Sequence, residues 1–109
     1  MGGDPDERSR SKTQRKADLG MVLAYHEEQL RLLLEHVREG FASLDAGETD
    51  AFELDALIHH YSLSAKELWK FCGNGEARIT WAVSSLEHAR HTGKLPDWWE
   101  IGDPERRRR

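Results

Sequence analysis

The segment from Asp50 to Cys72 limits the possible folds of this chain most strongly, because it combines a helix start, a single apolar face and a helix stop. Asp50, followed by Glu53 three positions later, has the pattern of an N-terminal capping box, and Gly73 stands where a helix commonly ends. Apolar residues between these signals recur at alternating spacings of four and three, which places them on one side of an α-helix. They are Leu54, Ile58, Tyr61, Ala65, Leu68 and Cys72. The pattern predicts a helix over residues 51–72. Further apolar residues lie beside its stripe and predict that the helix is covered from more than one side; they are Phe52, Leu57, Trp69 and Phe71.

A longer helix is predicted upstream, from a start between Lys12 and Asp18 to an end near Leu44. Two rows of residues repeat in it every seven positions, a pattern typical of helices that pack side by side. One row is Leu19, His26, Leu33 and Gly40, and the other is Leu23, Leu30, Val37 and Leu44. Further apolar residues widen the stripe, which favours a bundle over a two-stranded coiled coil; they are Leu32, Leu34 and Phe41. Gly40 costs roughly 1 kcal/mol relative to alanine within a helix, so the helix can either continue through this position or break there.

The rest of the chain predicts a third helix and an aromatic C-terminal segment. The short connector 45–50 implies that the first two helices are antiparallel neighbours. The third helix is expected from Glu76 to about His91, with Gly93 after it and Pro96 preventing a simple continuation. We therefore predict an all-α, antiparallel three-helix bundle that forms one domain over residues 12–101. Residues 1–11 and the Arg-rich residues 102–109 are predicted to be disordered tails.

Charge is distributed unevenly along this chain of 109 residues, whose net charge is −4. Residues 17–105 carry 7 basic and 17 acidic side chains, a net charge of −10, whereas both ends of the chain are basic.

The polar N-terminus and the single cysteine predict a cytoplasmic protein without an internal disulfide. No apolar run approaches the length of a transmembrane helix, so no membrane association is predicted.

The basic tails allow contacts with the phosphates of a nucleic acid, without readout of the bases. The candidate residues are Lys12, Arg15, Lys16, Arg106, Arg107, Arg108 and Arg109. The alternative is that the solvated tails contact the acidic body of their own chain. A folded nucleic-acid module usually has a basic face, which this acidic body does not offer.

Six histidines raise the question of a metal site. His88 and His91 share one helical face and could supply two ligands, whereas His59 and His60 point about 100° apart. The sequence contains no HExxH, ExxH or CxxC motif. We therefore predict no metal, no cofactor and no enzymatic activity.

Two chemically versatile side chains lie within the apolar rows. His26 is expected to be a partly buried histidine with satisfied hydrogen bonds, or else a pH-sensitive polar residue that sets the helix register. Cys72 stands at a helix C-terminus, which disfavours the thiolate, so a buried structural cysteine is expected there.

Four tryptophans are the most unusual feature of the composition. Trp98 and Trp99 are expected either to fold back and cover the end of the bundle or to form an exposed aromatic patch with Trp81. Trp69 lies one step off the main stripe of its helix.

The segment IHHYSLSAKELWKFC is followed later in the chain by DWWE. The residues of interest in these two segments are Ile58, His59, Tyr61, Ala65, Glu67, Leu68, Trp69, Lys70, Phe71, Cys72, Trp98 and Trp99. Together they resemble a family of small uncharacterised bacterial proteins, typical of actinobacteria, with an IHxYHxxAxELWKFC-like core. Ser62 stands where this pattern has a histidine, so the resemblance implies no imidazole chemistry there. It implies a cytoplasmic bacterial protein with no known activity, and its core includes His59, Tyr61, Glu67, Trp69 and Lys70.

The function predicted from the sequence is that of a non-enzymatic helical protein-interaction module that forms a homo-oligomer or binds a protein partner. The expected interface residues are Leu23, Leu30, Val37, Trp81, Trp98 and Trp99. The first alternative is nucleic-acid association through the basic tails. The second is a metal-binding protein or enzyme with a histidine-containing site, built on His59, Tyr61 and Glu67 or on His88 and His91.

Overall fold

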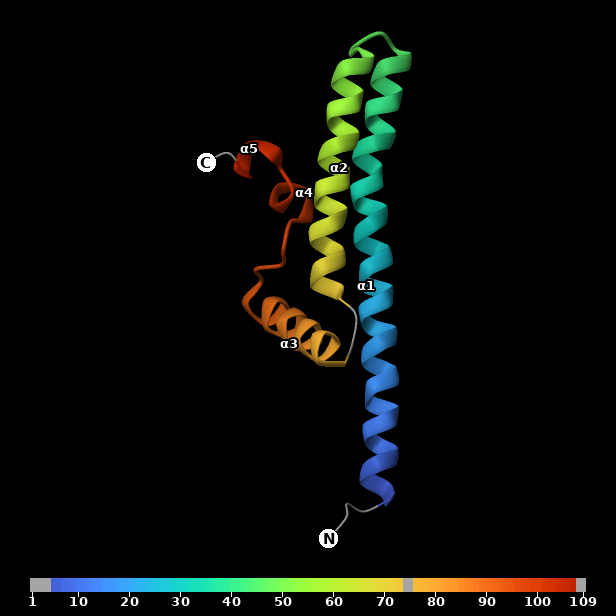
Figure 1. Ribbon diagram of the computed structural model, residues 1–109, viewed down its shortest axis with the longest axis vertical. Helices are drawn as coiled ribbons and strands as arrows, with labels where there is room; N and C mark the ends of the chain where they lie inside the picture. The colour runs from blue at the N-terminus through green and yellow to red at the C-terminus, as the bar shows by residue number, and fades with distance from the viewer. Residues whose placement is uncertain (1–4, 74–75, 108–109) are drawn as a thin grey trace.

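The computed structural model describes the backbone of residues 5–73 and 76–107, and the side chains of residues 12–73 and 78–106. Every regular element within these ranges is a helix, so the predicted all-α class is confirmed. The elements are α1 (Pro5–Asp45), α2 (Ala51–Cys72), α3 (Glu76–Thr92), α4 (Trp98–Ile101) and α5 (Pro104–Arg107). Figure 1 shows α1 and α2 as a long antiparallel pair, with the three later helices gathered on one side of it.

The predicted N-cap at Asp50 and the predicted end of α2 at Gly73 are confirmed, whereas the carboxylate of Glu53 accepts a hydrogen bond from the hydroxyl of Thr49 and not the one that a reciprocal capping box needs. The carboxylate of Asp50 accepts a hydrogen bond from the backbone N–H of Glu53 at 2.8 Å, which satisfies one of the free N–H groups of the first turn. At the other end, Gly73 adopts a positive φ of 59° and its N–H donates to the carbonyl oxygen of Trp69 at 2.8 Å. Because left-handed backbone is cheap only for glycine, the sequence determines where this helix stops.

α1 continues through Gly40 without a break. A Cβ atom at Gly40 would contact the side chain of Leu57 and would lie 2.9 Å from Cδ1 of Leu54. The glycine is therefore a point of close approach between α1 and α2, where the leucines of α2 occupy the space that a side chain would need. The helical penalty of glycine is offset by this packing.

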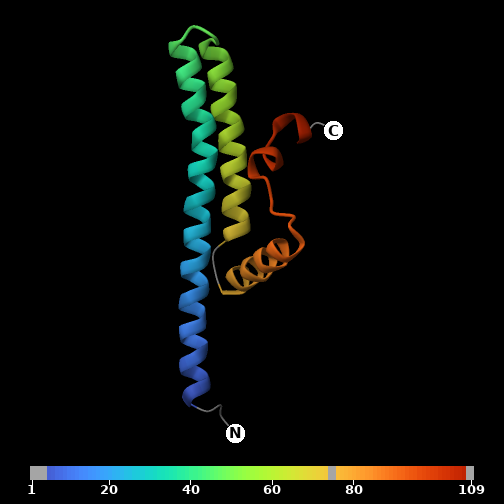
Figure 2. The same cartoon turned by 180° about the vertical axis from the view of Figure 1, so that it is seen from behind.

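α1 begins at Pro5, earlier than the predicted start between Lys12 and Asp18, and α5 lies within the predicted C-terminal tail. Once a helix is nucleated, polar residues can extend it without burying an apolar side chain. The side-chain amide of Gln14, for example, donates to the carboxylate of Asp18 one turn later, at 2.8 Å. As a result α1 projects well beyond the end of α2 (Figures 1 and 2). The predicted tail residues 1–4 and 108–109 lie outside the described residues.

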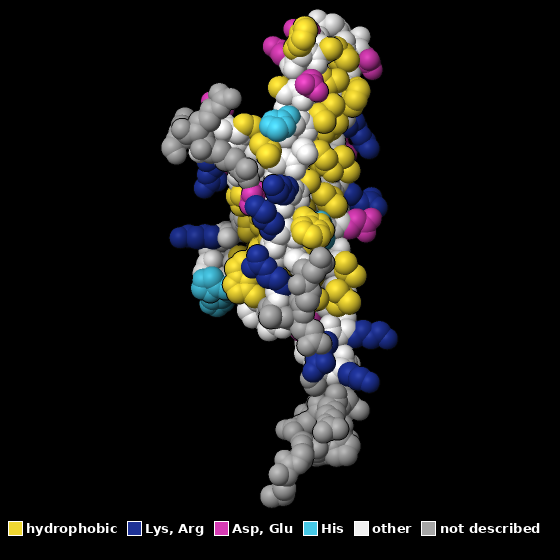
Figure 3. Space-filling model, in the orientation of Figure 1, with side chains coloured by type: hydrophobic (Ala, Val, Ile, Leu, Met, Phe, Trp, Pro, Cys, Tyr) yellow, Lys and Arg dark blue, Asp and Glu magenta, His cyan; other side chains and the backbone are white. Residues whose placement is uncertain are grey.

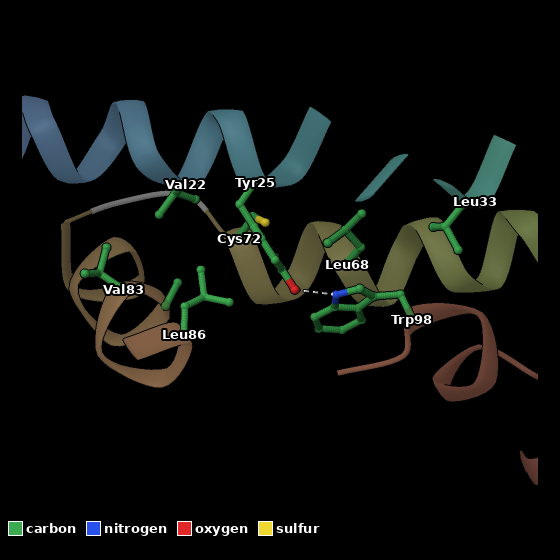
Figure 4. Close-up of a cluster of buried hydrophobic side chains, with 9 residues drawn as sticks. Val22, Tyr25, Leu33, Leu68, Cys72, Val83, Leu86 and Trp98 are labelled. Carbon is green, nitrogen blue, oxygen red and sulfur yellow. Dashed lines mark hydrogen bonds between the residues drawn. The ribbon is translucent and has the colours of Figure 1, made fainter. Parts of the chain in front are cut away.

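The core lies where α1, α2, α3 and α4 meet. Its buried residues are Val22, Tyr25, Leu33, Leu68, Cys72, Ala82, Val83, Leu86 and Trp98. Figure 4 shows side chains from all four helices converging there. α3 packs against both long helices near the end of α2, and α4 packs against α2 farther along (Figures 1 and 2).

Candidate functional site: an apolar interaction face

The C-terminal segment covers one side of the α1–α2 pair through Trp98. The indole Nε1–H of Trp98 donates to the hydroxyl of Tyr25 at 2.7 Å inside the core (Figure 4). Burial raises the pKa of the Tyr25 hydroxyl, so the phenol stays protonated. The indole also packs at a tilt against the ring of Phe71, with 5.1 Å between centroids. Trp98 thus contacts α1 and α2 at once, and it attaches α4 to the side of the pair on which Tyr25 and Phe71 lie.

Trp99 attaches α4 to the same side, one step further along the pair. Its indole is stacked between the imidazoles of His36 and His60, at centroid distances of 3.9 and 3.5 Å. Nε2 of His60 donates to the carbonyl oxygen of Trp99 at 2.6 Å, and the hydroxyl of Ser64 donates to the same oxygen at 3.3 Å. One histidine comes from α1 and the other from α2, so the indole closes the groove between the two helices on this side.

The opposite side of the pair carries a long apolar surface that the described residues of α3, α4 and α5 do not cover. We call it the apolar face and define it by Leu23, Leu30, Leu34, Val37 and Phe41 of α1 with Ile58, Ala65 and Trp69 of α2. Leu30, Val37 and Ala65 are half-buried, whereas the five larger outer side chains are between 39% and 57% exposed. Figure 3 shows a column of hydrophobic side chains running along the α1–α2 pair.

Helix geometry places the exposed residues of this face on the side away from α4. Leu34 precedes His36 by two positions, and Ile58 precedes His60 by two. Two positions turn an α-helix by about 200°, so each exposed residue points nearly opposite to the residue that contacts Trp99. Leu23 and Trp69 stand in the same relation to Tyr25 and Phe71, which contact Trp98.

The face is large enough for a specific interface. From Leu23 to Phe41, at about 1.5 Å per residue, it is roughly 27 Å long. Two helices packed about 9 Å apart make it roughly 18 Å wide. An area on the order of 500 Å² on each of two partners would bury about 1,000 Å², the lower limit for a specific protein interface. Exposed apolar patches of this size commonly mark binding surfaces.

The predicted interface residues fall into two groups. Leu23, Leu30 and Val37 belong to the apolar face. The expectation of an exposed patch that includes Trp98 is wrong, because Trp98 is buried in the core. Trp99 is half-buried between two imidazoles, and Trp81, which is about half exposed, packs edge-on against Phe71 on the covered side. The LPDWW segment therefore folds back and buries Trp98 as predicted, but the prediction that it covers the end of the bundle is wrong, because α4 packs along the side of the α1–α2 pair.

Leu34, Phe41, Ile58 and Trp69 were not predicted as interface residues. Leu34 and Phe41, seven apart, only widened the predicted stripe of α1, and Ile58 was assigned to the core face of α2. The sequence signal that could have identified these residues as exposed was the width of the apolar stripes of the two long helices, because each stripe is wider than one neighbouring helix can cover.

The residues singled out by the family resemblance do not converge. Tyr61 lies half-buried along the seam, His59 is exposed, and Trp69 belongs to the apolar face. The ammonium group of Lys70 lies 3.4 Å from the carboxylate of Glu67 in an exposed pair one turn apart. These side chains are spread around the circumference of α2, so they do not form a common site.

Within the described residues, no three His, Cys, Asp or Glu side chains lie close enough together to hold a metal ion. His88 and His91 are exposed on α3, and His26 is half-buried on α1. Burial lowers the pKa of His26, which keeps its ring neutral at pH 7.

Cys72 is buried at the end of α2, and burial raises the pKa of its thiol to about 11. We expect alkylation by iodoacetamide at pH 8 to be about 100-fold slower in the native protein than in the unfolded chain, because the thiolate is the reacting species. The rate can be followed by mass spectrometry with and without denaturant. Equal rates in the two conditions would contradict the buried, protonated thiol.

The basic side chains of the nucleic-acid alternative lie at separate places. Lys12, Arg15 and Lys16 are exposed on the projecting part of α1, whereas Arg106 is on α5, beside the other half of the α1–α2 pair (Figures 1 and 2). The side chains of Arg107, Arg108 and Arg109 lie outside the described ones. The described basic residues therefore do not combine into one patch.

No helix in the described part of the chain is long and apolar enough to cross a membrane. Comparison of the chain with protein-family models, with curated proteins and with solved structures gives no match.

Proposed function

We propose that this chain is a non-enzymatic helical interaction module that self-associates through the apolar face. The observation that carries the proposal is the position of Leu23, Leu34, Phe41, Ile58 and Trp69, all exposed on one side of the α1–α2 pair. Burying apolar area stabilises a complex by roughly 25 cal/mol per Å², before the costs of association are subtracted. When two copies pack through this face, each copy buries the apolar area of its own face against that of the other.

The heptad rows of α1 support the same proposal. Leu23, Leu30 and Val37 repeat every seven residues, and α2 covers only one flank of this row. A second helical pair placed on the other flank would complete a four-helix arrangement, in which the apolar residues of such a repeat are buried on both flanks.

Three finer expectations accompany the proposal. The first is that the unit that associates is an antiparallel three-helix bundle, and the second is a location in the bacterial cytoplasm. The third is membership of the bacterial family whose core sequence is similar to residues 58–72 of this chain. The arrangement of α1, α2 and α3 around one core supports the first, and the residues of α2 support the third.

The test is light scattering on a size-exclusion column at two protein concentrations. The native chain should elute as a dimer or larger species, and the double variant Leu34→Glu, Phe41→Glu should be a monomer. Two carboxylates per copy would have to be buried unpaired in the interface, so the dissociation constant should rise on the order of 100-fold or more.

Phe52 provides the matched control. It is 87% exposed on the first turn of α2 and lies off the apolar face. The variant Phe52→Glu should keep the oligomeric state of the native chain. A native chain that remains monomeric at both concentrations would refute the proposal.

A further inference from the structure

The apolar face also carries information about the orientation of its partner. We infer that a second copy of the chain packs on this face in reverse orientation, about a twofold axis that lies between the two faces, perpendicular to the helices and level with residue 32 of α1. This inference rests on the proposed self-association and adds its geometry. In this arrangement α1 of one copy lies antiparallel to α1 of the other, and α2 antiparallel to α2.

The apolar residues of the face are centred on that axis. On α1, Leu23 and Phe41 stand nine residues to either side of residue 32, and Leu30 and Leu34 stand two to either side. His36 and His60 stack on the same indole, so residue 36 of α1 lies level with residue 60 of α2. Residue 32 is then level with residue 64, which is the middle of the α2 part of the face between Ile58 and Trp69. The centres of both rows therefore lie at the same level, so that one axis can relate both rows to those of a second copy.

The charges at the edge of the face are complementary under the same rotation. Glu27 and Arg38 both flank the apolar row of α1, and they stand five and six residues from residue 32 on opposite sides. The twofold axis brings Glu27 of each copy beside Arg38 of the other. Charged residues at such edge positions set the orientation of helices that pack side by side.

These two residues are available for contacts between copies. In the single chain, Glu27 pairs with Arg31 at 3.0 Å and Arg38 pairs with Glu35 at 3.4 Å, and all four side chains are at least 51% exposed. Exposed pairs within one helix are weak, so these side chains can exchange partners at little cost.

The long axis of the molecule has opposite charges at its two ends. Lys12 and Lys16 are exposed on the projecting part of α1, whereas Asp45, Glu48 and Asp50 are exposed at the turn between α1 and α2. Figure 3 shows Lys and Arg side chains toward the lower end and Asp and Glu side chains around the upper end. Lys16 stands sixteen residues, about 24 Å, from residue 32 along α1, and Asp45 at the last position of α1 stands thirteen residues, about 20 Å, on the other side. Reverse packing sets the basic end of each copy against the acidic turn of the other.

The other twofold arrangement, with the axis along the helices, brings like ends together. It would place the acidic turns of the two copies side by side and the basic ends side by side. Juxtaposed like charges disfavour an interface, whereas complementary ends favour it and speed association. The charge pattern therefore selects the reverse arrangement.

The experiment is a charge exchange in the full-length chain, with the dimer dissociation constant measured by sedimentation equilibrium at low ionic strength. Glu27→Lys and Arg38→Glu should each raise the dissociation constant about tenfold, since each replaces two attractive contacts per dimer by repulsive ones. The double variant Glu27→Lys, Arg38→Glu should return to within about threefold of the native value, because the exchanged charges meet again across the axis. Circular dichroism of each variant checks that α1 keeps its helix content.

Glu28→Lys is the matched control, since Glu28 is exposed on α1 next to Glu27 but on the opposite side from the apolar face; it should leave the dissociation constant unchanged. A dimer in which the two single effects add in the double variant, or in which neither single reversal has an effect, would overturn the reverse orientation while leaving self-association intact. A native chain without any dimer would instead overturn the proposed function on which the orientation depends.

Discussion

Replacing Trp98 by alanine is expected to lower the free energy of unfolding by about 3–5 kcal/mol, the usual cost of removing a buried tryptophan side chain. Trp98 is only 6% exposed, belongs to the core and contacts both α1 and α2. Its loss would leave a cavity beside Leu68 and Phe71 and would deprive the hydroxyl of Tyr25 of its indole donor. Since small domains are stable by only about 5–15 kcal/mol, the change should be evident in urea unfolding followed by circular dichroism.

Two further variants separate the contributions to this effect. Trp98→Phe removes the hydrogen bond but keeps most of the apolar volume, so it should cost about 1–3 kcal/mol. Phe52→Ala removes a large aromatic side chain that is 87% exposed, and it should change stability by no more than about 0.5 kcal/mol. If Trp98→Ala were as mild as Phe52→Ala, the C-terminal segment would not be docked in the core.

Replacing Gly102 by alanine is the second substitution with a large expected effect. Gly102 is buried where α4 meets α2, and a Cβ atom there would collide with the backbone N and Cα of Ser64. The backbone in the middle of a long helix cannot yield as a flexible side chain can. We therefore expect α4 to be displaced, the Trp99 stacking between His36 and His60 to be weakened, and the free energy of unfolding to fall by about 3 kcal/mol. Tryptophan fluorescence together with urea unfolding would measure both effects.

Gly20→Ala is the matched control for this prediction. Gly20 lies within α1, and a Cβ atom there would meet nothing within 4 Å. The same chemical change should therefore stabilise the protein by about 1 kcal/mol, through the helix propensity of alanine. Equal effects of the two substitutions would contradict the close contact between Gly102 and α2.

Part of the fold follows directly from local sequence signals. The limits of α2 are encoded by Asp50, Glu53 and Gly73, because capping depends on residues next to one another in the chain. The start of α1 could not be predicted in the same way. The polar residues after Pro5 have no apolar period, and a helix extended from an existing one needs none.

The same division applies to the apolar face. Periodicity predicted that Leu23, Leu30 and Val37 share a side of α1, and the structure agrees. It could not predict that Trp98 is buried, since this depends on a hydrogen bond to Tyr25, 73 residues away in the chain. Nor could it show that Gly40 is a site of close helix packing, because the leucines that contact it belong to another helix.

The sequence by itself thus determined the all-α class, the caps of α2 and the apolar rows of both long helices, because each of these depends on residues within a few turns of one another. Only the tertiary structure decided which side of the α1–α2 pair is covered. Both sides carry apolar residues, and helix periodicity alone does not distinguish them. The docking of Trp98 and Trp99 against Tyr25, His36 and His60 determines which side of the pair is covered. This long-range packing leaves the opposite face exposed.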